Sequence, residues 1–402
     1  MRVLVVNAGS SSLKLSLLGE RDRLLAHEDL RRSDELDVGA ALEGFLDASP
    51  PADAIGHRVV HGGAEFVEPL VIDSRSDAQL SRLADLAPLH NPPALEAVHE
   101  LRRRRPGLVQ VACFDTSFHA TLPAKAATYA LPRSWRAELG IRRFGFHGFS
   151  HAWASRRAAD LLGRPLASTR LVTAHIGAGA SLAAVAGGRS VDTTMGFTPV
   201  AGLVMATRPG DVDPGALLWA MRHGVGVEEA EGDLEHRSGL LGLSGRTGDL
   251  RQVIAGADAG DPECAGAYDV YVYRLQREIG AMVVALGGID ALVFTGGAGE
   301  GSSRLRADVC AGLGVLGVDV PRQDEPGADE QRAGEPGAGQ EVEPALADAT
   351  APPSGGTGDR VVSSPGVSPA VVVVRSREDV EIARAVRRAL ASPGASPRPS
   401  VG

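Results

Sequence analysis

The sequence has no apolar run that approaches the roughly 18 residues a membrane-spanning helix requires. Lysine is scarce as well, since only Lys14 and Lys125 occur, and neither precedes the Ser or Thr that a Walker A phosphate loop needs. Cysteine occurs three times, widely spaced and without a Cys-x-x-Cys pair. These shortages argue against a membrane protein, a P-loop nucleotide enzyme, a zinc knuckle and a disulfide-stabilised secreted domain. A reducing cytoplasm suits such a sequence.

The residues that are present indicate a folded protein with room for two domains. The chain has 402 residues, of which 44% are hydrophobic and 23% are charged. Its formal net charge is −9, which disfavours a general nucleic-acid binder. The apolar run at residues 3–6 is too short for a signal-peptide core, and we predict a buried strand there.

Apolar runs typical of strands alternate with helical patterns along most of the chain. Examples of the runs are Val3–Val6, Val109–Phe114, Leu171–His175 and Ala291–Thr295, with a helical stretch at Tyr268–Leu286. This alternation predicts α/β domains with mixed or parallel sheets.

The segment Arg322–Ser368 has a different composition, because it is rich in Pro, Gly, Ala, Glu and Asp and has no aromatic residue. Such a segment buries little apolar surface, so we predict a low-complexity, disordered surface insertion. A strand at Ala370–Val374 and a helix from about Glu378 to Leu390 follow it. Residues 393–402 are expected to form a flexible tail.

Several predicted strands end directly in turns rich in glycine and serine. The three turns are Asn7–Ser12, His175–Gly179 and Thr295–Gly299. Backbone N–H groups at such turns can bind phosphate, because glycine lets the main chain approach closely. The turns are therefore candidate phosphate sites at strand ends, and for the first of them, taken alone, a polar hairpin between two strands is an equal alternative.

Longer motifs carry a family resemblance. Asn7–Lys14 and Met195–Pro214 closely resemble the two signature regions of acetate kinases. Further matches follow in the expected order: His57-Arg58-Val59-Val60-His61-Gly62-Gly63, Leu89-His90-Asn91-Pro92, Phe114–His119 and Arg143–Gly148. The resemblance covers nearly the whole chain except 322–368. The sequence is similar to acetate kinases and related short-chain carboxylate kinases.

The resemblance implies a fold of two duplicated α/β domains of the actin and sugar-kinase type (ribonuclease H-like) around a nucleotide cleft. The N-terminal domain would comprise 1–150 plus 374–392, with the C-terminal helix returning to it. The C-terminal, nucleotide-binding domain would comprise 151–373 and contain the insertion. A cytoplasmic homodimer that binds neither nucleic acid nor membrane would be expected.

The implied reaction is reversible, direct in-line phosphoryl transfer from ATP to acetate, giving ADP and acetyl phosphate. The cofactor would be Mg²⁺, with Mn²⁺ as a substitute. Arg58 and Arg208 match the two active-site arginines, whose planar forks suit carboxylate and phosphoryl oxygens. Asp115 would orient the nucleophile and hold the metal, and His147 would stabilise the transferring phosphoryl group.

Further positions follow from the same resemblance. Glu378 and Asn7 would assist Asp115 at the metal. The acetate pocket would use Arg58 together with Val60, Leu89, Phe146 and Pro199. The nucleotide would be bound by Ser10, Ser12, Lys14, His175, Gly177, Gly179, Asp249, Arg251, Gly296, Gly297, Gly299 and Glu300. Taken singly, each of these residues could also have a purely structural role. The arginines could form ion pairs, Asp115 could cap a turn, and His175 and the pocket residues could pack in the core.

Two alternatives stay open. A propionate or butyrate kinase would use the same scaffold, because an apolar pocket discriminates one methylene by only about 1–3 kcal/mol. A non-catalytic nucleotide-binding regulator is the alternative outside enzymes. Its support is three departures from the family pattern: Ala178 and Gly301 where asparagine is usual, and Arg377 beside Glu378 in place of asparagine.

Overall fold

The computed structural model describes residues 1–9, 12–33, 36–83, 91–318 and 358–391. The chain divides into two compact units, each described separately below. Unit 1 comprises Met1–Trp153, Gly196–Pro199 and the C-terminal segment from Arg377, and unit 2 comprises Ala154–Met195 and Val200–Ser376. The change from one unit to the other therefore falls inside a helix, α6 (Gly148–Leu161), and again just before Glu378.

Unit 1 is built on a six-stranded sheet with the order β3-β2-β1-β4-β6-β5. Its strands are β1 (Val3–Ala8), β2 (Ser12–Leu18), β3 (Leu24–Arg31), β4 (Ala54–Val59), β5 (Leu70–Val71) and β6 (Val109–Phe114). Strands β1, β4 and β6 are parallel neighbours, whereas β2, β3 and β5 pair antiparallel. Besides α6, its helices are α1 (Val38–Ala48), α2 (Ser74–Arg82), α3 (Asn91–Arg104), α4 (Ala124–Ala127), α5 (Arg133–Glu138) and α14 (Glu378–Ala391).

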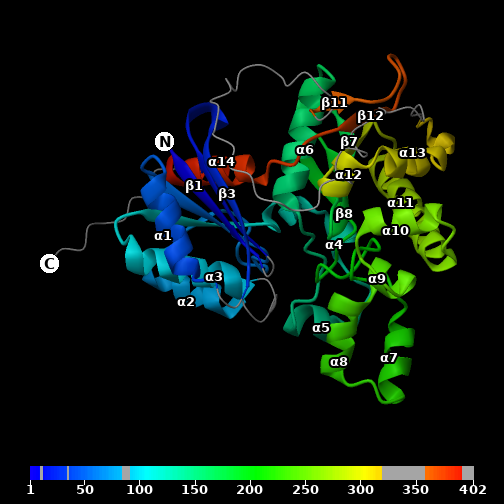
Figure 1. Cartoon of the computed structure of the whole chain (residues 1–402), viewed down its shortest axis with the longest axis horizontal. Coiled ribbons are helices and arrows are strands. Elements are labelled where there is room, and N and C mark those ends of the chain that lie inside the picture. The colour runs from blue at the N-terminus through cyan, green and yellow to red at the C-terminus, as the bar shows by residue number, and fades with distance from the viewer. Residues whose placement is uncertain (10–11, 34–35, 84–90, 319–357, 392–402) are drawn as a thin grey trace. The chain divides into compact units, whose positions relative to one another are not determined.

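Alternation along β1 places apolar side chains on both faces of this sheet. Leu4 and Val6 belong to a core cluster that includes residues of α1 and α3, such as Leu42 and Leu101. Val3 and Val5 belong to a second cluster with the apolar face of α14. The last helix of the chain thus packs against the first strand, and Figure 1 shows α14 in red beside β1 in blue.

Unit 2 repeats the same strand order in a second six-stranded sheet, β9-β8-β7-β10-β12-β11. Its strands are β7 (Arg170–Ile176), β8 (Ala180–Ala186), β9 (Arg189–Thr193), β10 (Ala291–Thr295), β11 (Arg360–Val361) and β12 (Ala370–Val373). Strands β7, β10 and β12 are the parallel neighbours here. The directions match those of the first sheet strand for strand. The predicted duplication of an α/β domain is therefore confirmed.

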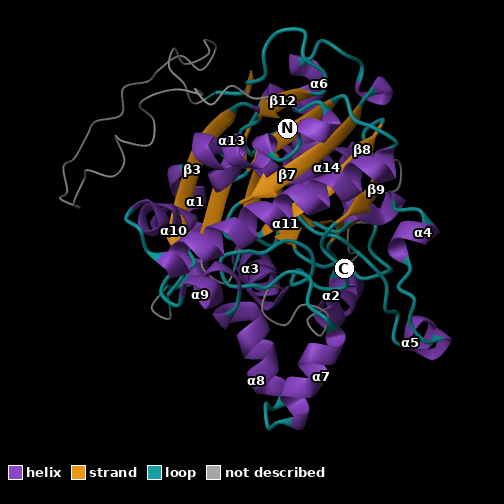
Figure 2. Cartoon of the chain, turned by 90° about the vertical axis from the view of Figure 1, so that its right-hand side faces the viewer, coloured by secondary structure: helices purple, strands orange, loops and turns teal. Residues whose placement is uncertain are grey.

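Helices accompany the second sheet as they do the first (Figure 2). They are α7 (Pro214–Arg222), α8 (Val227–Gly232), α9 (Gly239–Ser244), α10 (Leu250–Asp258), α11 (Pro262–Leu286), α12 (Gly297–Gly301) and α13 (Ser303–Ala311). Buried side chains of α11 recur at helical spacing, as at Tyr271, Leu275 and Ile279, and α11 packs on β7, β8 and β9. Among helices in the described ranges, none is long and apolar enough to cross a membrane.

The predicted strands at 109–114 and 291–295 have the same bounds as β6 and β10. The predicted insertion differs at its C-terminal end, because residues 360–361 form β11 and pair with β12. Val362 N continues the pairing with Val371 O at 2.8 Å, and Ser363 is buried. Backbone hydrogen bonding to β12 orders this part of the segment despite its composition. The remainder of the predicted insertion, up to residue 357, and the predicted tail lie outside the described residues.

Candidate active site

Four predicted site residues of unit 1 meet at one edge of its sheet. Asn7 lies near the end of β1, Arg58 near the end of β4, and Asp115 directly after β6. Since these strands are adjacent and parallel, their carboxyl ends share one edge, where α/β proteins commonly bind ligands. Glu378, the first residue of α14, joins them.

Arg58 connects the other three members of this carboxylate cluster (Asn7, Arg58, Asp115 and Glu378). Its Nη1 donates to Asn7 Oδ1 at 3.3 Å, and its Nη2 donates to Asp115 Oδ2. Its Nε lies 3.7 Å from Glu378 Oε2. One planar guanidinium therefore hydrogen-bonds a carboxylate and an amide and lies within ion-pair distance of a second carboxylate.

Burial shapes the charges of the cluster. Burial raises the pKa of Glu378, an effect that the Arg58 charge opposes and the Asp115 carboxylate reinforces. Burial alone would lower the pKa of Arg58, but Asp115 and Glu378 raise it above its usual value. Arg58 therefore carries a permanent positive charge between two acidic groups.

The cluster fits a divalent cation. Asp115 is fully buried, and its Oδ1 has no hydrogen-bond partner within the described residues. An orphaned carboxylate oxygen is costly unless a ligand satisfies it. No cluster of three or more His, Cys, Asp or Glu side chains able to hold a metal occurs in the described ranges. Two carboxylates and an amide suit Mg²⁺, which retains water and phosphate ligands.

His147 follows a strained turn beside Asp115. Its φ is 55°, a left-handed conformation that is uncommon outside glycine and that often marks functional sites. The next residue, Gly148, donates its N–H to Asp115 O at 3.0 Å. The side chain of a larger residue would not fit, since a Cβ at Gly148 would lie 2.1 Å from that same oxygen. The turn thus brings His147 next to Asp115 in the fold.

An aromatic wall forms around His61, which follows Val60. The His61 ring lies 4.6 Å from the Phe144 ring, 5.3 Å from Phe146 and 6.4 Å from Phe197, centroid to centroid. Of the predicted pocket residues, Val60, Phe146 and Pro199 are buried. Leu89 lies outside the described residues. The aromatic group around His61 was not predicted, although His61, Phe144 and Phe146 all lie within the family motifs.

Asn91 holds the strand end that carries this wall. Its Oδ1 accepts the His61 N–H at 3.1 Å, and its Nδ2 donates to His61 O at 3.1 Å and to Leu83 O at 2.9 Å. Asn91 is fully buried at the start of α3. The motif Leu89-His90-Asn91-Pro92 thus has a structural role that its sequence alone did not reveal.

Arg208 lies in unit 2, where it pairs with Glu235. Its Nε donates to Glu235 Oε2 at 2.8 Å. The neighbouring Thr207 Oγ1 donates to the backbone oxygen of Glu235 at 2.7 Å. Glu235 was not predicted as a site residue, because it belongs to none of the family motifs and stands in an acidic stretch typical of a solvated helix.

Two predicted nucleotide turns lie side by side in unit 2. His175, the residue before the last of β7, pairs with Thr295 at the end of β10. The turn at 177–179 and the glycine segment at 296–299, which leads into α12, therefore share one sheet edge. Gly296 has a φ of 80°, and a Cβ there would lie 2.8 Å from Ile176 O. Only glycine therefore allows the two turns to approach so closely.

The Glu300 carboxylate accepts hydrogen bonds from backbone N–H groups. Its Oε1 accepts the Gly296 N–H at 2.9 Å and the Ser376 N–H at 2.9 Å. Burial raises the pKa of Glu300, which these N–H donors partly counter. The side chain joins the glycine turn to the segment that precedes Glu378 in the sequence. A direct contact of Glu300 with nucleotide stays a prediction.

Asp249 and Arg251 form an exposed pair at the start of α10. Asp249 caps the helix by accepting the Arg251 N–H at 2.9 Å, and it accepts a second bond from Arg251 Nη2 at 2.6 Å. Both bonds stay within the first turn of α10, so they do not link the pair to the glycine turns. Its role at the adenosine stays a prediction.

The remaining predicted phosphate residues lie on the first hairpin of unit 1. Lys14 pairs with Asp29 across β2 and β3, with 3.1 Å between Nζ and Oδ2. Ser12 begins β2, and its backbone oxygen accepts the Gly9 N–H at 2.9 Å. Ser10 lies outside the described residues. This hairpin occupies the position that the His175–Gly179 turn occupies in the second sheet.

Of the three departures from the family pattern, Arg377 has a local explanation, and nothing in the structure explains Ala178 or Gly301. Arg377 pairs with Asp379, with Nε 2.9 Å from Oδ1 and Nη2 3.0 Å from Oδ2. Ala178 contributes its backbone oxygen to the Ala206 N–H at 3.0 Å. A Cβ at Gly301 would meet nothing within 4 Å. The guanidinium of Arg377 is thus held by the carboxylate two residues further along the chain.

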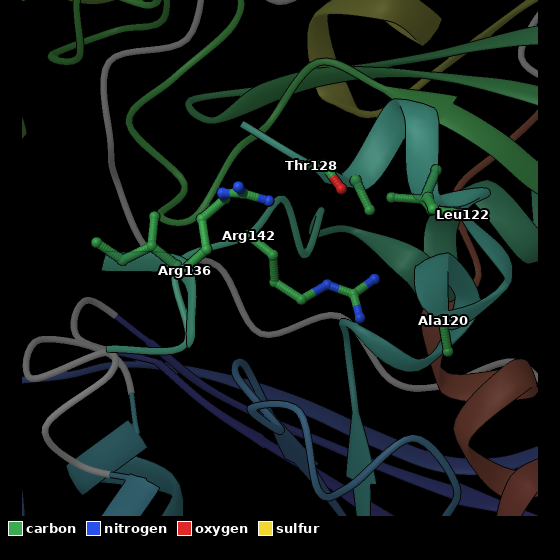
Figure 3. A pocket seen from close by; sticks show the side chains of 8 residues that line it. Ala120, Leu122, Thr128, Arg136 and Arg142 are labelled. Atoms are coloured by element: carbon green, nitrogen blue, oxygen red, sulfur yellow. The ribbon is translucent and has the colours of Figure 1, made fainter. Parts of the chain in front are cut away.

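A pocket of about 380 Å³ lies elsewhere in unit 1. Leu122 and Ala127 contribute to its lining, and Arg136 and Arg142 border it (Figure 3). It includes none of the predicted site residues.

Comparison with known proteins identifies relatives along nearly the whole chain. A family model described as the acetokinase family matches residues 42–335. An acetate kinase of Leifsonia xyli subsp. xyli is 41% identical over 97% of this chain and 99% of the relative. An acetate kinase of Thermosynechococcus vestitus is 46% identical over 84% of this chain and 75% of the relative.

Solved structures show the same relationship. The crystal structure of Porphyromonas gingivalis acetate kinase has a TM-score of 0.80 and 33% sequence identity, covering 96% of this chain and 99% of the other. That of a propionate kinase from Francisella tularensis has a TM-score of 0.81 and 30% identity, covering 96% and 98%. The similarity in sequence and in fold extends over both units.

Proposed function

Because this chain belongs to the acetokinase family, we propose that it is an acetate kinase, which reversibly transfers the terminal phosphoryl group of ATP to acetate. The observation that carries the proposal is the carboxylate cluster at the ends of β4 and β6, where Arg58 contacts both Asp115 and Glu378. Phosphoryl transfer depends mainly on positioning and charge neutralisation, which such a cluster supplies.

The residues have separable roles in this proposal. Acetate is ionised near pH 7, so its attack needs no general base. Arg58 and Arg208 would neutralise the acetate carboxylate and the oxygens of the transferring phosphoryl group. Asp115 orients Arg58 through their hydrogen bond, and the His147 imidazole would donate a hydrogen bond to the phosphoryl group. In-line displacement at phosphorus would give acetyl phosphate and ADP directly.

The proposed metal is Mg²⁺, with Mn²⁺ as a substitute. Asp115 Oδ1 and the Glu378 carboxylate would hold it, with Asn7 Oδ1 near its water shell. Bound there, the ion would neutralise phosphate charge. The nucleotide phosphates would face the glycine turns at 177–179 and 296–299, where the backbone approaches closely.

The proposed acyl pocket comprises Val60, Leu89, Phe146 and Pro199. Propionate is the second candidate substrate, because the Francisella propionate kinase resembles this chain as closely in fold as the Porphyromonas acetate kinase does. Its extra methylene would cost about 1–3 kcal/mol of transition-state binding. We therefore expect propionate to be a slower substrate.

We also propose that the enzyme is a cytoplasmic homodimer. Its three cysteines are free and buried, which suits a reducing compartment. Apolar side chains such as Leu218 and Trp219 of α7 are exposed in the single chain and could be covered by a second copy. Light scattering should give twice the mass of one chain.

The test of the proposed function is turnover of the purified chain with MgATP and acetate, with acetyl phosphate trapped by hydroxylamine. Propionate and butyrate are assayed in parallel. Formation of trapped acetyl phosphate that requires acetate and is lost in Arg58→Ala supports the proposed kinase activity. Measurable ATP binding without trapping for any carboxylate would favour the regulator.

A further inference from the structure

The contact between Arg208 and Glu235 is a directional ion pair that is largely shielded from solvent. Arg208 Nε donates to Glu235 Oε2 at 2.8 Å. The two side chains are only 18% and 12% exposed, respectively. Charged pairs at this burial are rigid and strongly hydrogen bonded, unlike ion pairs at the surface. Glu235 therefore restricts where the Arg208 guanidinium lies.

Backbone contacts fix the same segment independently of this side chain. Thr207 Oγ1 donates to Glu235 O at 2.7 Å, and the Ser238 N–H donates to Thr207 O at 3.0 Å. The Leu240 N–H donates to Met205 O at 2.9 Å. The loop that carries Arg208 is thus docked on residues 235–240 along its length.

Glu235 lies in a π-helical turn, Asp233–Arg237, between α8 and α9. Such turns are rare, and they occur frequently at functional sites because the extra residue redirects backbone and side-chain groups. Here the turn allows one residue to accept hydrogen bonds from Thr207 through its backbone and from Arg208 through its carboxylate.

A guanidinium is planar, so a bond that fixes Nε also fixes the plane and direction of the two Nη groups. We infer that Glu235 is the positioning residue that orients Arg208 toward the oxygens of the reacting groups. This inference rests on the proposed catalytic role of Arg208. Glu235 itself is assigned no contact with substrate or metal.

The test compares five variants of the full chain: Glu235→Ala, Glu235→Gln, Arg208→Ala, the double variant Glu235→Ala/Arg208→Ala, and Asp233→Asn. The last is a matched control, because Asp233 lies in the same turn and pairs with Arg237 at the surface. For each variant, kcat, KM for acetate, KM for ATP and the unfolding temperature are measured.

We expect Glu235→Ala to lower kcat/KM for acetate about 10- to 100-fold, since small misplacements of a positioning group have effects of this size. KM for ATP should stay within about twofold. The kcat/KM of Glu235→Gln should exceed that of Glu235→Ala about fivefold or more, because the Gln amide oxygen still accepts the Nε–H of Arg208. Asp233→Asn should stay within about twofold of the parent.

The double variant separates positioning from an independent effect. If Glu235 acts through Arg208, then Glu235→Ala should change activity less than about twofold in the Arg208→Ala background. The inference is overturned if Glu235→Ala alone stays within about twofold of the parent, or if its loss is equally large in both backgrounds. It is also overturned if Glu235→Gln is as impaired as Glu235→Ala while both remain folded.

Failure of the proposed function would look different, because the parent chain itself would then show no acetate-dependent turnover, and the inference would fall with it. Full turnover in Arg208→Ala would leave the kinase activity standing but would overturn the role proposed for Arg208, and the inference with it. Normal turnover in Glu235→Ala together with a large loss in Arg208→Ala would overturn the inference alone.

Discussion

Arg58 donates a hydrogen bond to the fully buried Asp115 from the neighbouring strand. The register of the sheet sets up this contact, since β4 and β6 are parallel and pair Val59 with Phe114. The same guanidinium lies 3.7 Å from Glu378, which the chain supplies from its far end. A single arginine therefore links residues separated by most of the sequence.

Asp115→Asn should reduce turnover at least about 100-fold, comparable to the removal of other preorganised electrostatic groups. The change also leaves the buried Arg58 without one of its two countercharges, so unfolding free energy should fall by about 2–5 kcal/mol. Steady-state kinetics and urea unfolding measure the two effects.

The matched control is Asp53→Asn, which removes a carboxylate that pairs with Arg2 at the surface, 3.4 Å from Nη2 to Oδ1. Its effect on stability should stay below about 1 kcal/mol. Equal destabilisation by both variants would contradict the buried pairing of Asp115.

Gly148→Ala should impair catalysis without touching a catalytic side chain. The added Cβ would lie 2.1 Å from Asp115 O and 2.9 Å from Phe118 Cβ, so the turn that carries Asp115 must move. We expect a loss of about 1–3 kcal/mol in stability and a clear fall in kcat. Gly280→Ala is the control, because its Cβ would meet open space within α11. That control should stabilise the protein by about 0.5–1 kcal/mol, and a similar outcome for Gly148→Ala would refute the argument.

Stability should fall as pH is lowered from 6.5 toward 4. Burial lowers the pKa of His57 to about 4 from its usual 6.5, despite a 2.8 Å hydrogen bond from its ring to Gln110. The unfolded chain binds a proton in this window whereas the folded chain does not, so the stabilisation is complete above pH 6.5 and is lost as pH falls.

Thermal unfolding across this pH range tests the argument with His57→Asn. Between pH 4 and 6.5, the slope of unfolding free energy against pH should become shallower by the amount that corresponds to about one proton bound on unfolding. The control His223→Asn alters an exposed residue at the end of α7 and should leave the slope unchanged. An unchanged slope in His57→Asn would show that His57 does not titrate this way.

Val60→Ala should enlarge the proposed acyl pocket and improve propionate relative to acetate. The ratio of kcat/KM for propionate to kcat/KM for acetate should rise about tenfold, which is within the range by which a pocket discriminates one methylene. Val59→Ala is the control, because the Val59 side chain belongs instead to the core beside Phe114. It should destabilise the fold and leave the ratio unchanged, and a ratio that rises equally in both variants would refute the pocket assignment.

Local patterns predicted much of the fold. The apolar runs at 109–114 and 291–295 became β6 and β10 with the same bounds, since buried parallel strands are continuous apolar segments. The family motif containing Arg58 predicted an active-site arginine, and the structure places Arg58 near the end of β4. These features depend on neighbours in sequence, which a pattern can show.

The contacts that depend on distant segments were not predictable in the same way. Glu235 stands in an ordinary acidic stretch, and only the docking of residues 235–240 on the Arg208 loop identifies it. The short strand β11 has no apolar pattern of its own, because its order comes from pairing with β12. Asn91 likewise shows its role only through hydrogen bonds to His61.

The most direct test of the proposed kinase activity is the reverse reaction, because acetyl phosphate is the higher-energy side and ATP can be detected sensitively. The purified chain is mixed with ADP, acetyl phosphate and Mg²⁺, and ATP is followed over time. We predict ATP formation that requires all three components and is lost in Arg58→Ala and Asp115→Asn. A folded chain that binds ADP yet forms no ATP, or forms it equally well without Arg58, would contradict the proposal.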